Sequence, residues 1–205
     1  NQFIDRLDTN NENRFFKMWS SLTASLTFAF THSHWFNAVE TEVYAFSGFM
    51  TALVIYLIML WSKKINNSNH IIYLMLISYI IGLATGLHLL NLLTIPFIGL
   101  IIYYTIGKLS VKNLFFTLSL SIIIFFCIQS LIIQGLPHIT LSIGLIGLVC
   151  LVFLLLIVSG YVIKKNKALS SIFLSSVLLI IVGYLTYFAI FIRLSQDPNI
   201  DENNP

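Results

Sequence analysis

Two glutamates, Glu40 and Glu42, stand in the stretch HSHWFNAVETEVYA between long apolar runs, in a chain of which only 9% of the residues are charged. In a helix beginning near Ala38, Glu40 and Tyr44 share one face, and Glu42 points about 160° away. If the residues before Val43 are instead extended or form a turn, both carboxylates can face one vestibule. There they could meet a cation, a sugar or a catalytic proton.

The same stretch has a purely structural interpretation. Glu40 and Glu42 can be solvated acids at a helix N-terminus, where the helix macrodipole stabilises negative charge. Trp35, Phe36 and Tyr44 fit the aromatic belt that anchors helices at a membrane interface. The residue types alone leave both interpretations open.

A second group of polar residues lies in GLATGLHLLNLLTIP, where His88 and Asn91 share one face of a helix at positions i and i+3. Gly82 and Gly86 have the GxxxG spacing that lets two helices approach closely. A histidine among leucines needs a partner. It can hold a lipid phosphate as the imidazolium, act as an acid or base, or form a hydrogen bond between helices.

Other kinds of chemistry have no pattern here. The sequence contains no HExxH, P-loop or GxSxG motif and no Cys/His ligand spacing. Cys127 and Cys150 stand in apolar stretches without neighbouring ligands, and His138 belongs to QGLPHIT, which we expect to be a loop. The net charge of +3 gives no indication of nucleic acid. We therefore assign no metal-binding residues and predict no nucleic-acid partner, while the residues identify no cofactor and leave metal dependence open.

The composition places these residues in a membrane protein. Hydrophobic residues make up 58% of the chain, with 17 Phe among 205 residues and a mean hydropathy of +0.90, well beyond the usual soluble range. We predict an all-α, polytopic membrane helix bundle forming a single transmembrane domain over residues 1–205. Apolar runs long enough to cross a bilayer define about seven segments: 15–31, 41–61, 71–87, 90–106, 114–133, 141–163 and 169–192.

Basic residues orient this bundle, because Lys and Arg favour the cytoplasmic side. With seven segments, ten of the eleven Lys and Arg residues fall on one side, and only Arg193 falls on the other. Treating 71–106 as one interrupted helix would break this regularity, so we expect two short helices there and a cytoplasmic N-terminus. The outer side then receives most of the other titratable residues: His32, His34, Glu40, Glu42, His88, His138, Asp197, Asp201 and Glu202.

Three blocks, W-F-x-A-V-E-x-E-V-Y-A, G-x-H-L-L-N-L-L-x-I-P and I-R-x-x-x-x-P-x-I-D-E-N-x-P, together resemble a bacterial family of large multi-spanning proteins that carry a domain of unknown function. That family is similar to protein O-mannosyltransferases of the GT-C fold and to a vertebrate relative that mannosylates extracellular receptor domains. The resemblance covers most of the chain. It implies a protein of the bacterial inner membrane.

The resemblance also implies an activity and a site. The activity is transfer of a sugar, mannose by this likeness, from a polyprenyl-phosphate donor to a Ser/Thr hydroxyl of a protein at the outer face. Membrane lipid, the lipid-linked donor and the protein acceptor would be its partners. Trp35, Glu40, Glu42 and Tyr44 would line the vestibule, and by position His88 and Asn91 would hold the lipid phosphate.

Two departures from the family pattern matter. Thr41 replaces the usual Gly between the glutamates and would stiffen that stretch. The family's Asp-Gly-Glu-Phe motif, whose aspartate would be the base, does not occur in this sequence. The chain begins without an initiator Met and ends on a polar run, so we expect a fragment without activity of its own. A membrane transporter and a non-enzymatic assembly protein are the alternative functions.

Overall fold

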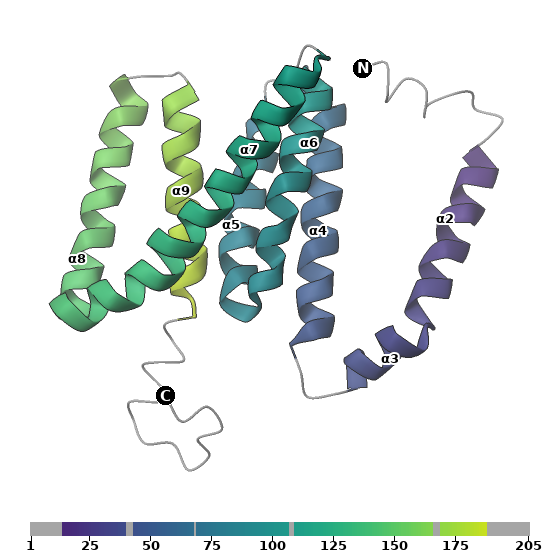
Figure 1. Cartoon of the computed structure of the whole chain (residues 1–205), viewed down its shortest axis with the longest axis horizontal. Helices are drawn as coiled ribbons and strands as arrows, with labels where there is room; N and C mark the ends of the chain where they lie inside the picture. The colour runs from purple at the N-terminus through teal and green to yellow at the C-terminus, as the bar shows by residue number, and fades with distance from the viewer. Residues whose placement is uncertain (1–13, 40–42, 68, 107–108, 166–168, 188–205) are drawn as a thin grey trace.

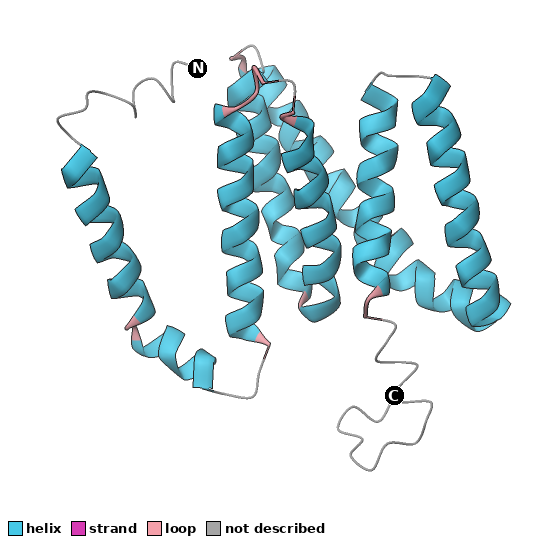
Figure 2. Ribbon diagram, turned by 180° about the vertical axis from the view of Figure 1, so that it is seen from behind, coloured by secondary structure: helices cyan, strands magenta, loops and turns pink. Residues whose placement is uncertain are grey.

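The computed structural model describes residues 14–39, 43–67, 69–106, 109–165 and 169–187, and all regular secondary structure within these ranges is helical (Figures 1 and 2). The predicted all-α membrane helix bundle is confirmed. Its elements in chain order are α2 (Arg14–Ala29), α3 (His32–Val39), α4 (Tyr44–Lys63), α5 (Ile71–Leu87), η2 (Leu89–Leu93), α6 (Thr94–Ile106), α7 (Val111–Cys127), η3 (Ile128–Gln134), α8 (Gly135–Lys165) and α9 (Leu169–Leu185).

Three continuous helical stretches in the described part of the chain are long and apolar enough to cross a membrane: Tyr44–Lys63, Leu89–Ile106 and Val111–Gly144. Shorter apolar helices occupy Ile71–Leu87, Ile146–Tyr161 and Ile172–Leu185. The first predicted segment, 15–31, corresponds to α2, which carries five Ser and Thr residues and belongs to neither group. The total of seven spans stays a prediction.

The break predicted inside 71–106 is present. Helix α5 ends at Leu87, and His88 has extended backbone angles, φ −156° and ψ 127°. The 3₁₀ helix η2 then carries the chain into α6. Two helices therefore occupy this region.

Two predicted polar breaks are helical instead. The stretch after Thr31 forms α3. QGLPHIT is not a loop, because the π-helix η3 leads directly into α8, whose third residue is Pro137. Proline has no N–H to donate to the carbonyl oxygen of Ile133 four residues earlier, and that oxygen instead accepts a hydrogen bond of 3.3 Å from the Tyr184 hydroxyl. The chain reverses later, at Gly144, whose φ of 73° is strained for residues with a Cβ atom.

Helix α5 lies at the centre of the packing: it contacts α4 on one side and α9 on another, while α6 contacts both α4 and α7 (Figure 1). The α5–α9 contact is a close backbone approach. A Cβ atom added to Gly82 would clash with the carbonyl oxygen of Ile180, and one added to Gly183 would lie 2.5 Å from the carbonyl oxygen of Tyr79. The GxxxG spacing of Gly82 and Gly86 thus marks the face of α5 that packs on α9.

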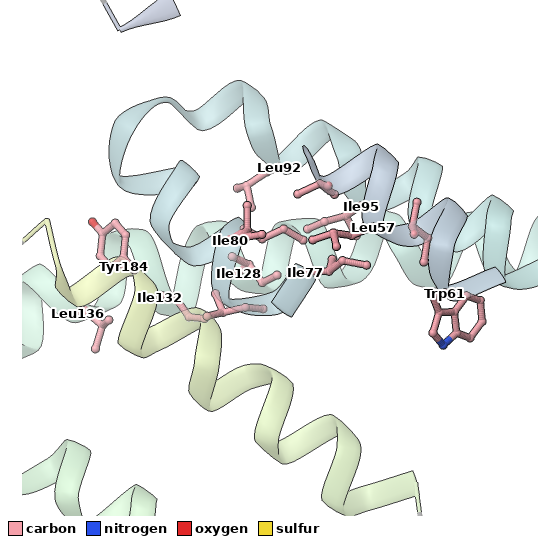
Figure 3. Close-up of a cluster of buried hydrophobic side chains, with 14 of the residues drawn as sticks. Leu57, Trp61, Ile77, Ile80, Leu92, Ile95, Ile128, Ile132, Leu136 and Tyr184 are labelled. Atoms are coloured by element: carbon pink, nitrogen blue, oxygen red, sulfur yellow. The ribbon is translucent and has the colours of Figure 1, made fainter. Parts of the chain in front are cut away.

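An apolar core joins these helices (Figure 3). The most deeply buried large side chains are Ile58 and Trp61 of α4 and Leu92 of η2. The cluster continues through residues of α5, α6, η3, α8 and α9: Ile77, Ile80, Ile81, Ile95, Ile128, Ile132, Leu136, Leu148, Ile180 and Tyr184. The segment that joins α5 to α6 therefore packs, through Leu92 and Ile95, into a core to which several helices contribute.

The two ends of the bundle differ in charge. Four described basic residues lie at the end where α2 begins, α4 ends and α7 begins: Lys17, Lys63, Lys64 and Lys112 (Figure 1). There Lys64 Nζ donates a hydrogen bond of 2.8 Å to the Tyr73 hydroxyl, which raises the pKa of Lys64. The opposite end carries Tyr44 and His88. This separation agrees with the charge pattern of the sequence.

Replacing Gly82 by Ala should destabilise the bundle, because the new methyl group meets the backbone of α9 rather than a movable side chain. Overpacking of this kind costs about 1–3 kcal/mol. Gly160→Ala is the matched control, since nothing lies within 4 Å of a Cβ added there. Thermal unfolding of both variants in detergent checks the prediction, and equal unfolding temperatures would contradict the α5–α9 packing.

Candidate functional site at the Tyr44–His88 end

Tyr44 and His88 come together because α4 begins where the neighbouring α5 ends. Their ring centroids lie 5.2 Å apart with an interplanar angle of 54°. Tyr44 is 45% exposed and His88 is half-buried. This pair places a phenol ring and an imidazole at one rim of the bundle.

The backbone at His88 is fixed on both sides. Its N–H donates to the carbonyl oxygen of Ala84 at 2.9 Å, which closes the last turn of α5. Its Nδ1 accepts a hydrogen bond of 3.2 Å from the N–H of Leu90. The ring is therefore tied to the start of η2 and is held against Tyr44.

Asn91 lies inside the bundle, with 2% of its surface exposed. Its Nδ2 donates to Ser47 Oγ at 2.9 Å, to the carbonyl oxygen of Ala84 at 3.1 Å and to that of His88 at 3.0 Å. Its Oδ1 accepts a hydrogen bond of 2.7 Å from the Thr51 hydroxyl. The Asn91 network, defined as Asn91 with Ser47, Thr51 and the two carbonyl groups, joins α4 to the end of α5.

The helical argument that placed His88 and Asn91 on one face was wrong. It assumed continuous helix, but His88 has extended backbone angles and lies just before the 3₁₀ helix formed by 89–93. Asn91 consequently points into the bundle and contacts the backbone of His88, while the His88 ring stays at the rim.

Sequence reasoning missed Ser47 and Thr51, although a signal exists. Tyr44, Ser47 and Thr51 follow the spacing i, i+3 and i+7 of one helix face. A hydroxyl stripe in an apolar helix needs partners inside a membrane bundle, and Asn91 is the nearest amide in the predicted neighbouring segment.

Trp35 lies on α3 and is 59% exposed. Its ring stacks with that of Phe30, with centroids 6.5 Å apart. Helix α3 contacts α4 and lies at the same end of the molecule as Tyr44 (Figure 1). The acids Glu40 and Glu42 fall outside the described residues, between α3 and α4 in the sequence.

Among residues whose placement is described, no group of three or more His, Cys, Asp or Glu side chains could hold a metal ion. Cys127 and Cys150 are free thiols on the exposed surface.

The sequence of residues 2–112 matches the family described as the protein O-mannosyl-transferase TMEM260 N-terminal domain. The chain belongs to this family. Comparison with curated proteins and with solved structures gave no match. The matched region of the TMEM260 family extends from before α2 to the first turn of α7, so it contains Tyr44, His88 and Asn91. This membership is consistent with a membrane glycosyltransferase.

Asn91→Ala should lower stability by about 2–4 kcal/mol, because it removes the hydrogen bonds of the Ser47 and Thr51 hydroxyls to the carboxamide in the interior and one of the two hydrogen bonds at each carbonyl group. Asn66→Ala, in the exposed turn after α4, removes the same group from the surface and should change little. Denaturant or thermal unfolding in detergent measures both. A loss for Asn91→Ala no greater than that of the control would show that the Asn91 network does not stabilise the fold.

Proposed function

We propose that this chain forms part of a GT-C-type membrane glycosyltransferase that transfers mannose from a polyprenyl-phosphate donor to Ser/Thr of a protein at the outer face of the bacterial inner membrane. The observation that carries the proposal is the family match over residues 2–112. The Tyr44–His88 rim supports it, because the matched region brings hydrogen-bonding groups together at one end of an apolar bundle.

The reaction sets the demands on this rim. The acceptor hydroxyl attacks the anomeric carbon while the bond from that carbon to the phosphate oxygen breaks, so a base must take the hydroxyl proton and the leaving phosphate must be stabilised. In this family likeness the base is an aspartate that this chain does not contain. Trp35, Glu40, Glu42 and Tyr44 form the vestibule, and His88 contacts the phosphate.

The surroundings of His88 suit a lipid-linked donor. Leu89, Leu90 and Leu93 are exposed beside it, by 47%, 58% and 59%. In a bilayer these side chains face lipid, so a polyprenyl chain can lie along them while its phosphate reaches the polar rim. Asn91 is buried behind His88 and supports it by donating a hydrogen bond to the His88 carbonyl oxygen.

The position of His88 also bears on the transporter alternative. A transporter site built from broken helices lies near the middle of the bilayer and opens to both sides. His88 lies where α5 ends, at the end of the bundle opposite the described basic residues. This placement favours chemistry at one membrane face.

Glu42→Gln in the intact protein should lower sugar transfer at least about tenfold at an unchanged membrane level, because the loss of one charge at a polar site removes a charge-assisted hydrogen bond. Glu40→Gln should act in the same direction. Glu12→Gln, which lies outside the stretch HSHWFNAVETEVYA, is the control. The assay measures mannose transfer from mannosyl polyprenyl phosphate to a Ser/Thr peptide. Full activity of both variants would contradict a role of Glu40 and Glu42 in sugar transfer and favour their structural interpretation as solvated acids at a helix N-terminus.

A further inference from the structure

We propose that His88 contacts the donor phosphate as a neutral hydrogen-bond donor through Nε2, and that Asn91 and Thr51 are positioning residues that hold it in this state. The inference rests on the proposed function, since it names the role of one side chain in that site.

The first step concerns the protons of the ring. A backbone N–H can only donate, so the 3.2 Å contact between the Leu90 N–H and His88 Nδ1 makes Nδ1 an acceptor. The neutral imidazole then carries its proton on Nε2. A base needs a free lone pair, and in this tautomer the Nδ1 lone pair is occupied while Nε2 is protonated. The ring offers a donor instead, which matches the unprotonated oxygens of a phosphate diester.

The second step concerns what holds the backbone around His88 in place. The carbonyl oxygen of His88 accepts from both the side chain and the backbone N–H of Asn91, at 3.0 and 3.2 Å. The same Nδ2 group reaches the carbonyl oxygen of Ala84. One carboxamide therefore fixes the peptide on each side of the turn that presents the imidazole.

The third step concerns the orientation of that carboxamide. The Thr51 hydroxyl donates to Oδ1, and this bond turns the amide nitrogen of Asn91 toward Ser47 Oγ and the carbonyl oxygens of Ala84 and His88. Thr51 lies on α4, about two helical turns after Tyr44. The network thus couples the two helices that supply the two rings of the rim.

Two substitutions of His88 separate the roles of its nitrogens. The amide nitrogen of Gln can reach the place of Nε2, whereas the shorter Asn side chain reaches only the place of Nδ1. We expect His88→Asn to weaken binding of polyprenyl phosphate to the purified intact protein about tenfold more than His88→Gln does, the loss expected for a hydrogen bond to a charged group. Equal losses in the two variants, or no loss in either, would overturn the donor role.

The positioning role is tested with an isosteric pair. Thr51→Val removes the bond to Asn91, and Thr85→Val removes a buried hydroxyl that bonds to Ile81 within its own helix. Thr51→Val should weaken polyprenyl phosphate binding several-fold, about three- to tenfold, and Thr85→Val should not. In a His88→Ala background Thr51→Val should cause no further loss, because its effect passes through His88. Additive losses would overturn the positioning role.

Sugar transfer is measured alongside binding. If the wild-type protein binds polyprenyl phosphate with the expected dependence on His88 but transfers no mannose to any Ser/Thr peptide tested, the proposed function fails while the role of His88 stands. If transfer occurs and binding ignores every substitution at His88 and Thr51, the inference fails while the function stands.

Discussion

Ending a helix inside an apolar bundle exposes carbonyl groups that lipid cannot satisfy, and this constraint shapes the centre of the structure. Helix α5 stops at Leu87, and Asn91 adds a second donor to the carbonyl groups of Ala84 and His88, each of which also accepts a backbone N–H. Its own oxygen is satisfied by Thr51 on α4. One buried side chain thus ties the break between α5 and α6 to the neighbouring helix.

The position of this break determines much of the remaining arrangement. The chain returns as α6 beside α4, so the described lysines at the ends and starts of successive helices gather at one end of the bundle. The opposite end keeps the Tyr44 and His88 rings together. On the other side of α5, the small surface at Gly82 allows α9 to approach and complete the packing. Helix α5 is therefore held by close packing against α9 and by the hydrogen bonds of Asn91 at its end.

Much of this arrangement could be predicted from the sequence. Hydropathy sufficed for the fold class, because long apolar runs can only be helices in a bilayer. The alternation of charge located the break near His88, and the GxxxG spacing located a close helix contact. These features depend on composition and on spacing within one element.

The rest depends on local geometry that composition does not encode. Asn91 is buried while His88 stays at the rim because the extended backbone at His88 interrupts the helix that was assumed to run through both residues. The chain reverses at Gly144, not at Pro137, and the carbonyl oxygen that lacks a Pro137 N–H accepts from the Tyr184 hydroxyl of α9. The partners Ser47 and Thr51 required knowledge of which face of α4 meets α5. Each of these features depends on local backbone geometry or on contacts between helices, and neither can be derived from the hydropathy of one segment.

The central claim is that the end of the bundle carrying Tyr44 and His88 faces the outside, where the proposed transfer to proteins would take place. Single cysteines at Ser33, on the exposed surface of α3, and at Asn66, in the exposed turn after α4, test it directly in a Cys127→Ser, Cys150→Ser background. A membrane-impermeant maleimide added to intact cells should label the Ser33→Cys variant, and should label the Asn66→Cys variant only after permeabilisation. The reverse pattern would place the rim in the cytoplasm and contradict the account.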